Sequence, residues 1–201
     1  MYTVLGSTKN RTLRVIWTLE ELGLTYDQIK GNPGSAEIKA LNPSGKVPAL
    51  VVDGEVLPDS VAIMSFLSDR HDALTFPAGS VERLRMEGHI HFLLEEFDSL
   101  LWVAAKNSFV NPPEHRAAEV KPVLKWEFER SLKRLEDRLQ GAFLMGERFT
   151  IADILAVHCL NWAYTAKFPD ASAVLKAYAK RGRARPADAP VAHHHLHLPH
   201  R

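Results

Sequence analysis

The sequence predicts an α/β N-terminal domain followed by an all-α C-terminal domain, and three observations lead to this fold class. Over about the first 75 residues, short β-prone runs alternate with helical ones. From about Val81 the β signal vanishes, and long stripes of apolar residues at helical spacing replace it. The 201 residues are enough for two small domains with a real core, since 46% are hydrophobic and 24% are charged.

The chain opens with the pattern of a βαβ unit. Residues 2–5 are β-prone, and apolar residues at helical spacing follow from Leu13 to Leu22. Gly23 then stands where a helix C-terminus favours glycine. Residues 25–29 predict a second strand. A helix of this length between two strands predicts that the strands pair in parallel.

Four more elements are predicted in the rest of this domain: a short helix, the two strands of a hairpin and a longer helix. Pro43 follows the first helix and ends it, because a residue before proline avoids helical geometry. Asp53 and Gly54 form a turn dipeptide typical of β-hairpins. The order β-α-β-α-β-β-α fits a thioredoxin-like domain, which we expect at residues 1–77. The four elements are expected at residues 36–41, 49–52, 55–57 and 58–70.

Three helices are predicted in the second domain. Apolar stripes over residues 86–104 and 124–139 indicate two long amphipathic helices. Residues 150–163 are apolar at ten of fourteen positions, so this helix should lie at the buried centre of a helical bundle. Thr150 and Asp153 at its start have the spacing of a capping box, which we interpret as structural.

The domain boundary is expected near residues 76–80, with the helical domain at residues 82–185. Residues 186–201 differ in composition, and five of the ten histidines lie between His193 and His200. Such a cluster can bind metal, but its Pro- and Ala-rich setting indicates a flexible tail. We therefore predict no metal site.

Charge and cysteine content exclude several classes of function. Lys and Arg number 25 against 24 Asp and Glu, so no global basic field exists to hold nucleic acid or an anionic membrane. Cys159 is the one cysteine, which excludes an intramolecular disulfide, and its apolar surroundings indicate an inert core thiol. The sequence starts without a signal-peptide pattern and has no apolar run of about 20 residues. These features predict a cytoplasmic protein with no nucleic-acid or membrane partner.

Three short motifs of the first domain are candidate parts of a binding site, although each is also common in loops and helix caps. The turn at residues 6–10 precedes a helix whose free N–H groups favour an anion. Val47 and Pro48 precede a strand and suit a cis peptide that turns its backbone outward toward an extended ligand. Asp59 and Ser60 begin a helix and match the ammonium and carboxylate groups of an amino-acid zwitterion.

Taken together, these motifs resemble the glutathione S-transferase family, and the resemblance covers most of the chain. Its residues are 6–7, 17–23, 42–50, 57–63 and 149–153. The resemblance implies a thioredoxin-like domain, an all-helical domain, a homodimer and a role in detoxification. It also implies glutathione as co-substrate and no metal.

Carried over residue by residue, the resemblance assigns a role to each motif. Ser7 matches the catalytic serine of the serine-type classes, with Thr8 and Asn10 as alternatives. The family implies glutathione contacts along the remaining motifs, and in place of Asp59 it more often has Glu or Gln. These glutathione-binding residues are Lys46 for the glycyl carboxylate, Val47 before a cis Pro48 for the cysteinyl backbone, and Asp59 and Ser60 for the γ-glutamyl end.

The expected activity is that of a glutathione transferase, in which Ser7 donates a hydrogen bond to the glutathione sulfur and promotes its ionisation. The thiolate then attacks a small hydrophobic electrophile, for which Phe97, Leu101 and Trp102 are candidate contacts. Two alternatives stay open: a glutathione-dependent peroxidase or disulfide reductase, and a non-catalytic glutathione-binding or assembly module. Thiol–disulfide exchange through a protein cysteine is not expected, because residues 6–11 contain none.

Overall fold

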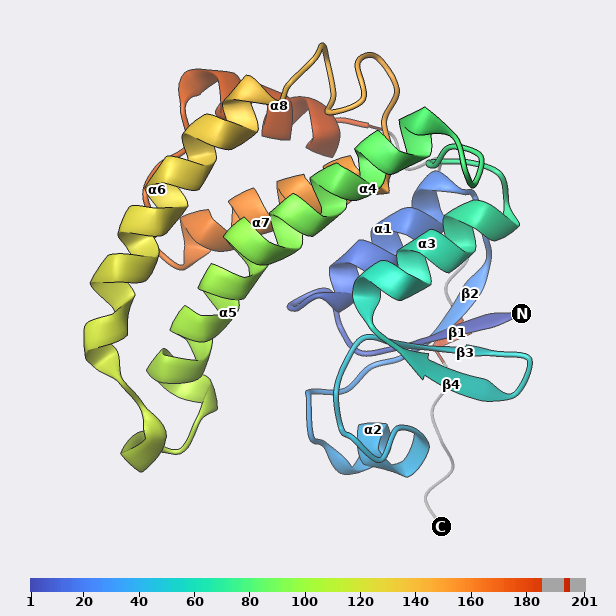
Figure 1. The fold of residues 1–201 in the computed structure, drawn as a ribbon. Helices are drawn as coiled ribbons and strands as arrows, with labels where there is room; N and C mark the ends of the chain where they lie inside the picture. Colours follow the sequence, from blue (N-terminus) through green and yellow to red (C-terminus); the bar gives the residue numbers. More distant parts are fainter. Residues whose placement is uncertain (186–193, 196–201) are drawn as a thin grey trace. The chain divides into compact units, whose positions relative to one another are not determined.

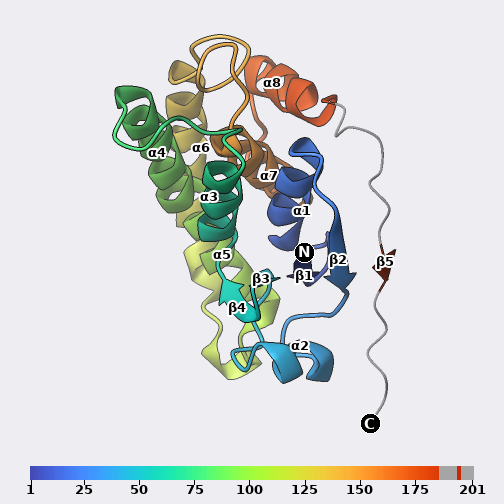
Figure 2. The ribbon, with the colours of Figure 1, turned by 90° about the vertical axis from the view of Figure 1, so that its right-hand side faces the viewer.

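The computed structural model describes residues 1–185 and the pair His194–His195. The described chain forms two compact units, Met1–Thr75 and Phe76–Arg185 (Figure 1). The flexible tail expected at residues 186–201 lies outside the described residues, apart from His194–His195. This pair forms a short strand, β5, which pairs in parallel with β2 (Tyr26–Ile29) of the first unit (Figure 2).

The first unit is built on a mixed sheet with the strand order β4-β3-β1-β2-β5. Strands β1 and β2 are parallel, whereas β3 is antiparallel to both β1 and β4. The predicted βαβ unit and hairpin are therefore confirmed. At the hairpin turn Asp53 and Gly54 both have positive φ, as a two-residue hairpin loop requires. The four longer strands are β1 (Tyr2–Leu5), β2 (Tyr26–Ile29), β3 (Ala49–Val52) and β4 (Glu55–Pro58).

Helices cover both faces of this sheet (Figure 2). Val15 and Leu19 of α1 and Leu67 of α3 belong to one core cluster, together with apolar side chains of β1 and β3. Ile38 of α2 is buried in a second cluster with Leu5 of β1. The two clusters use alternate residues of the strands, as the pleat requires. The helices are α1 (Thr12–Glu21), α2 (Ala36–Leu41) and α3 (Ser60–Arg70).

The end of α1 forms as the sequence predicts. Gly23 has φ +63°, a left-handed conformation that glycine adopts without a steric penalty. Its N–H donates to Glu20 O at 3.1 Å, and the Leu24 N–H donates to Leu19 O at 3.0 Å. These bonds satisfy carbonyl groups at the helix end and turn the chain back toward β2.

The regular elements of the second unit are helices, and the loop before the last two helices contains two isolated β-bridges, Phe143 with Gly146 and Met145 with Arg148. The stripe at residues 86–104 forms one helical rod, in which a π-helical turn joins α4 to α5. The helix expected over residues 124–139 is displaced toward the N-terminus, because α6 spans Lys121–Asp137. The last helix, α8, was not predicted as a separate element. The elements are α4 (Val81–Leu93), a π turn (Leu94–Asp98), α5 (Ser99–Ala105), a π turn (Lys106–Val110), 3₁₀ turns (Pro113–His115 and Ala118–Val120), α6 (Lys121–Asp137), α7 (Ile151–Thr165) and α8 (Ala173–Arg183).

Helix α7 is the buried centre of this unit, as predicted. All residues from Ile151 to Leu160 are buried, and Cys159 among them forms no disulfide within the described chain. The expected capping box is present, since the Thr150 N–H and Oγ1 donate to Asp153 Oδ2 at 2.8 and 3.1 Å. Of the helices that the structure describes, none combines the length and the hydrophobicity needed to cross a membrane.

Candidate functional site

The turn after β1 is fixed to the neighbouring strand. The Gly6 N–H donates to Ile29 O at 3.0 Å, and Gln28 Nε2 donates to Gly6 O at 2.9 Å. Gly6 has φ +119°, a conformation that L side chains rarely adopt. This anchored glycine places Ser7 between the end of β1 and the start of α1.

The structure distinguishes the three candidate thiol-stabilising residues of this turn. Ser7 Oγ is buried and has no hydrogen-bond partner among the described residues. Asn10 Oδ1 accepts from the Thr12 N–H at 2.9 Å and from Thr12 Oγ1 at 2.6 Å. This oxygen is therefore already engaged in stabilising the N-terminus of α1. Thr8 is exposed. A buried hydroxyl without a partner is available to a ligand atom, which favours Ser7.

The second motif lies against the first. The Val47–Pro48 peptide is cis, as expected. A Cβ at Gly6 would lie 3.0 Å from Val47 Cβ, so the turn before α1 and the residue before Pro48 are neighbours. Within the described chain, the Val47 N–H and carbonyl make no hydrogen bond with another residue. This backbone edge is open to a peptide-like ligand.

Asn42 holds the loop in front of this edge. Its side chain is buried, and Nδ2 donates to Lys46 O at 2.9 Å. Its Oδ1 accepts from Ser44 Oγ, also at 2.9 Å. The sequence places Asn42 before a proline and within the motif at residues 42–50 but assigns its side chain no role, whereas in the structure that side chain supports the loop. The Lys46 side chain is exposed.

The third motif begins α3 and keeps free polar groups despite its capping role. Asp59 has φ +79°, and its Oδ1 accepts from the N–H groups of Val61 and Ala62, both at 2.9 Å. No hydrogen bond to Asp59 Oδ2 forms within residues 1–185. Ser60 is buried, and its Oγ accepts from Arg14 Nη1 at 3.2 Å. Helix capping and ligand binding are therefore compatible at Asp59.

Arg14 is a neighbour of the site that sequence reasoning missed. It lies on α1 and is only 1% exposed. A charged residue beside the apolar Val15 and Ile16 was the available signal, but its partner lies 46 residues away.

The expected electrophile contacts need correction. Phe97 and Leu101 are fully buried, and Phe97 packs edge-to-face on Phe128 at a centroid distance of 5.0 Å. Both side chains belong to the core of the helical unit and present no surface to a ligand. Trp102 is 37% exposed and is the remaining candidate of the three.

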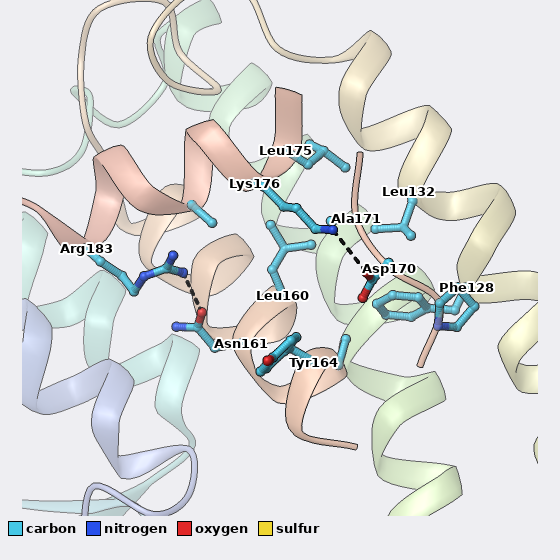
Figure 3. A pocket seen from close by; sticks show the side chains of 13 residues that line it. Phe128, Leu132, Leu160, Asn161, Tyr164, Asp170, Ala171, Leu175, Lys176 and Arg183 are labelled. Carbon is cyan, nitrogen blue, oxygen red and sulfur yellow. Dashed lines mark hydrogen bonds and ion pairs between the residues drawn. The ribbon is translucent and has the colours of Figure 1, made fainter. Parts of the chain in front are cut away.

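The helical unit also contains a pocket of about 360 Å³ between α6, α7 and α8 (Figure 3). Lys176 Nζ and Asp170 Oδ2 form an ion pair of 3.0 Å at its rim, and Arg183 Nη1 donates to Asn161 Oδ1 at 2.7 Å. None of the motif residues lines this pocket. We therefore assign it no part in the chemistry of the motifs.

Comparison with known proteins agrees with this architecture. The profile of the glutathione S-transferase N-terminal domain matches residues 11–70, and that of the C-terminal domain matches residues 97–186. The chain belongs to the glutathione S-transferase family. Its two units correspond to the two domains of that family, which confirms the predicted fold class.

Relatives in the glutathione S-transferase family share both sequence and structure with this chain. Glutathione S-transferase GstA of Escherichia coli O157:H7 is 32% identical over 132 residues, which are 64% of this chain and 62% of that protein. The match thus spans less than two thirds of that relative. A glutathione transferase from Methylococcus capsulatus is 28% identical with a TM-score of 0.77, covering 93% of this chain and 95% of that one. A beta-class enzyme from Sphingomonas chungbukensis is 26% identical with a TM-score of 0.75, covering 92% and 94%.

Proposed function

We propose that the chain is a glutathione transferase that activates the thiol of glutathione for attack on a small hydrophobic electrophile, acting as a cytoplasmic homodimer. The observation that carries this proposal is the buried Ser7 hydroxyl. It lacks a partner among the described residues and lies in the turn that contacts Val47. The glutathione sulfur would accept the hydrogen bond that Ser7 does not make within the protein.

The chemistry requires only modest stabilisation of an anion. A thiol with a pKa of about 8.5 is roughly 3% ionised at pH 7, and lowering the pKa by about two units raises this to about 75%. That shift corresponds to about 2.7 kcal/mol. A hydroxyl hydrogen bond to an ion contributes about 1.5–3 kcal/mol and a helix N-terminus about 0.3–1 kcal/mol. Ser7 and the start of α1 together are sufficient.

The reaction then proceeds through the sulfur of the co-substrate. The thiol proton passes to solvent, and Ser7 keeps its own proton and donates it in a hydrogen bond to the thiolate. The sulfur electron pair forms the new bond to the electrophilic atom, and the leaving group departs with the electrons of the broken bond. Ser7 is never the attacking group. Trp102 is proposed to contact the electrophile.

The other motifs would hold the peptide. The open backbone of Val47 would pair with the cysteinyl residue, and Lys46 would approach the glycyl carboxylate. Asp59 Oδ2 would accept from the ammonium group while Oδ1 caps α3. Ser60 would donate to the γ-glutamyl carboxylate through its N–H and hydroxyl groups.

Ser60→Ala tests the glutathione site. We expect the KM for glutathione to rise about ten- to a hundredfold with kcat nearly unchanged, since a charge-assisted hydrogen bond made in both ground and transition states is lost. Ser68→Ala is the matched control, because Ser68 is another buried serine of α3. The control should keep the wild-type KM. An unchanged KM in Ser60→Ala would remove this residue from the site.

Gly6→Ala tests the contact between the motifs. Its Cβ would lie 2.3 Å from Thr12 Oγ1, and the positive φ adds backbone strain. We expect the turn that carries Ser7 to shift and glutathione affinity to fall about tenfold, with a loss of about 1–3 kcal/mol in the free energy of unfolding. Gly54→Ala is the control, because Gly54 also has positive φ but nothing lies within 4 Å of its Cβ. Equal glutathione affinity in both variants would contradict the proposed arrangement.

A substrate panel separates the proposed activity from its alternatives. Turnover of halo-aromatic compounds or epoxides with glutathione supports the transferase. Turnover restricted to peroxides or disulfides indicates the peroxidase or reductase alternative. Retention on immobilised glutathione without turnover and without an activated thiol indicates a binding or assembly module.

A further inference from the structure

One positive charge is buried beside the proposed carboxylate site. Arg14 lies on α1 and is 1% exposed, and its Nη1 donates to Ser60 Oγ at 3.2 Å. This bond joins α1 to the first residue of α3. Arginine is rarely buried to this extent, because removing its charge from water is costly.

The direction of this hydrogen bond determines what the Ser60 hydroxyl does. A serine hydroxyl has one proton to donate, whereas a guanidinium group only donates. Because Ser60 Oγ accepts from Arg14, its own proton has to point to a different acceptor. No residue of the described chain accepts from this hydroxyl. The Ser60 O–H is therefore available as a donor to an incoming carboxylate.

The helix cap leaves a second donor next to this hydroxyl. Asp59 Oδ1 occupies the N–H groups of Val61 and Ala62, so these two are not available to a ligand. The N–H of Ser60 has no acceptor among the residues described. An N–H and an O–H of the same residue match the two oxygens of one carboxylate.

We propose that Arg14 is a positioning residue for the α-carboxylate of the γ-glutamyl group and acts on it through Ser60. The inference rests on the proposed function, because it adds a residue to that glutathione site. The guanidinium orients the Ser60 hydroxyl, and its charge strengthens the hydroxyl as a donor to an anion, more so in a buried environment than in water. The effect falls on glutathione affinity and not on the chemical step.

Three ligands distinguish this role from a structural one. Glutathione carries both charged groups, 4-aminobutyryl-cysteinylglycine lacks only the α-carboxylate, and glutaryl-cysteinylglycine lacks only the ammonium. Calorimetry gives the Kd of each for the wild type and for Arg14→Met. We expect the variant to weaken binding of glutathione and of the glutaryl analogue about tenfold or more, because an oriented donor to the carboxylate is lost. Binding of the aminobutyryl analogue should change less than about twofold, and kcat should stay within about twofold.

Three further variants make the test specific. Arg14→Lys keeps a charged donor, so it should recover most of the glutathione affinity. Thr18→Val is the control on the same helix, because Thr18 is buried and its Oγ1 donates to Arg14 O at 2.8 Å. It should bind all three ligands like the wild type. In a Ser60→Ala background, Arg14→Met should add less than about twofold, since the route through Ser60 is already lost.

The outcomes that would overturn the inference differ from those that would overturn the proposed function. An equal loss for all three ligands makes Arg14 merely structural. If Arg14→Met weakens binding of none of the three ligands while Ser60→Ala still weakens glutathione binding, Arg14 has no role in the site. If Arg14→Met does not fold, Arg14→Gln is measured against Arg14→Lys with the same three ligands and the same criteria. Wild-type protein that binds no glutathione overturns the proposed function, and the inference with it.

Discussion

Ser7→Ala is expected to raise the pKa of the bound glutathione thiol by about one to two pH units and to slow conjugation at pH 7 about ten- to a hundredfold. The physical reason is the loss of one hydroxyl hydrogen bond to the thiolate, about 1.5–3 kcal/mol. Glutathione affinity should change little, because in the proposed site Val47 and Ser60 hold the peptide. Raising the pH should restore part of the rate, since more of the thiol then ionises without assistance.

Thr8→Ala and Asn10→Ala are the controls within the same turn. We expect Thr8→Ala to behave like the wild type, because Thr8 is exposed. Asn10→Ala removes the acceptor of the Thr12 N–H and Oγ1, so it should destabilise the start of α1 by about 1 kcal/mol without the full shift in thiol pKa. Full activity in Ser7→Ala, with loss of activity in one of these variants, would transfer the role to that neighbour.

Asp153→Ala is expected to lower the free energy of unfolding by about 3–5 kcal/mol and the Tm by about 10 °C. Asp153 Oδ1 accepts from the Leu144 N–H and from Tyr178 Oη, both at 2.9 Å. Oδ2 accepts from the N–H and Oγ1 of Thr150. Burial raises the pKa of the Asp153 carboxyl, and these donors oppose the shift. Alanine would leave several buried donors without an acceptor at the centre of the helical unit.

Thermal unfolding of Ser80→Ala provides the comparison. Ser80 Oγ caps α4 by accepting from the Arg83 N–H at 3.1 Å in a partly exposed setting. We expect a loss of about 1 kcal/mol, the usual effect of removing a helix cap. Similar losses in the two variants would show that burial of the Asp153 carboxylate and its donors adds nothing to stability, contrary to our expectation.

The parts of the fold that could be predicted from the sequence are those with local signals. The turn dipeptide at Asp53 and Gly54 needs positive φ at both residues, and Gly23 needs it at a helix end, so the residue types themselves indicate the backbone. The high apolar content of residues 150–163 indicates burial whatever the neighbouring helices are. The cis Val47–Pro48 peptide was expected from the resemblance together with the position of proline before a strand.

What the sequence did not show depends on tertiary contacts. Arg14 and Ser60 meet across two helices, and no spacing in the sequence indicates this pair. Phe97 and Leu101 lie on an apolar stripe of the helical domain, and such a stripe packs in the core more often than it lines a pocket. Ser7 is favoured over Asn10 as the hydrogen-bond donor to the thiol because the Asn10 side chain is already hydrogen bonded within the protein. Only the structure shows this difference.

The most direct test of thiol activation is the pKa of the glutathione thiol when bound to the wild-type protein, followed by the ultraviolet absorbance of the thiolate as the pH is varied. We predict a value of about 6.5, roughly two pH units below that of the free thiol. In Ser7→Ala the value should return most of the way toward about 8.5. Bound glutathione with an unshifted pKa in the wild type would contradict thiol activation at this site.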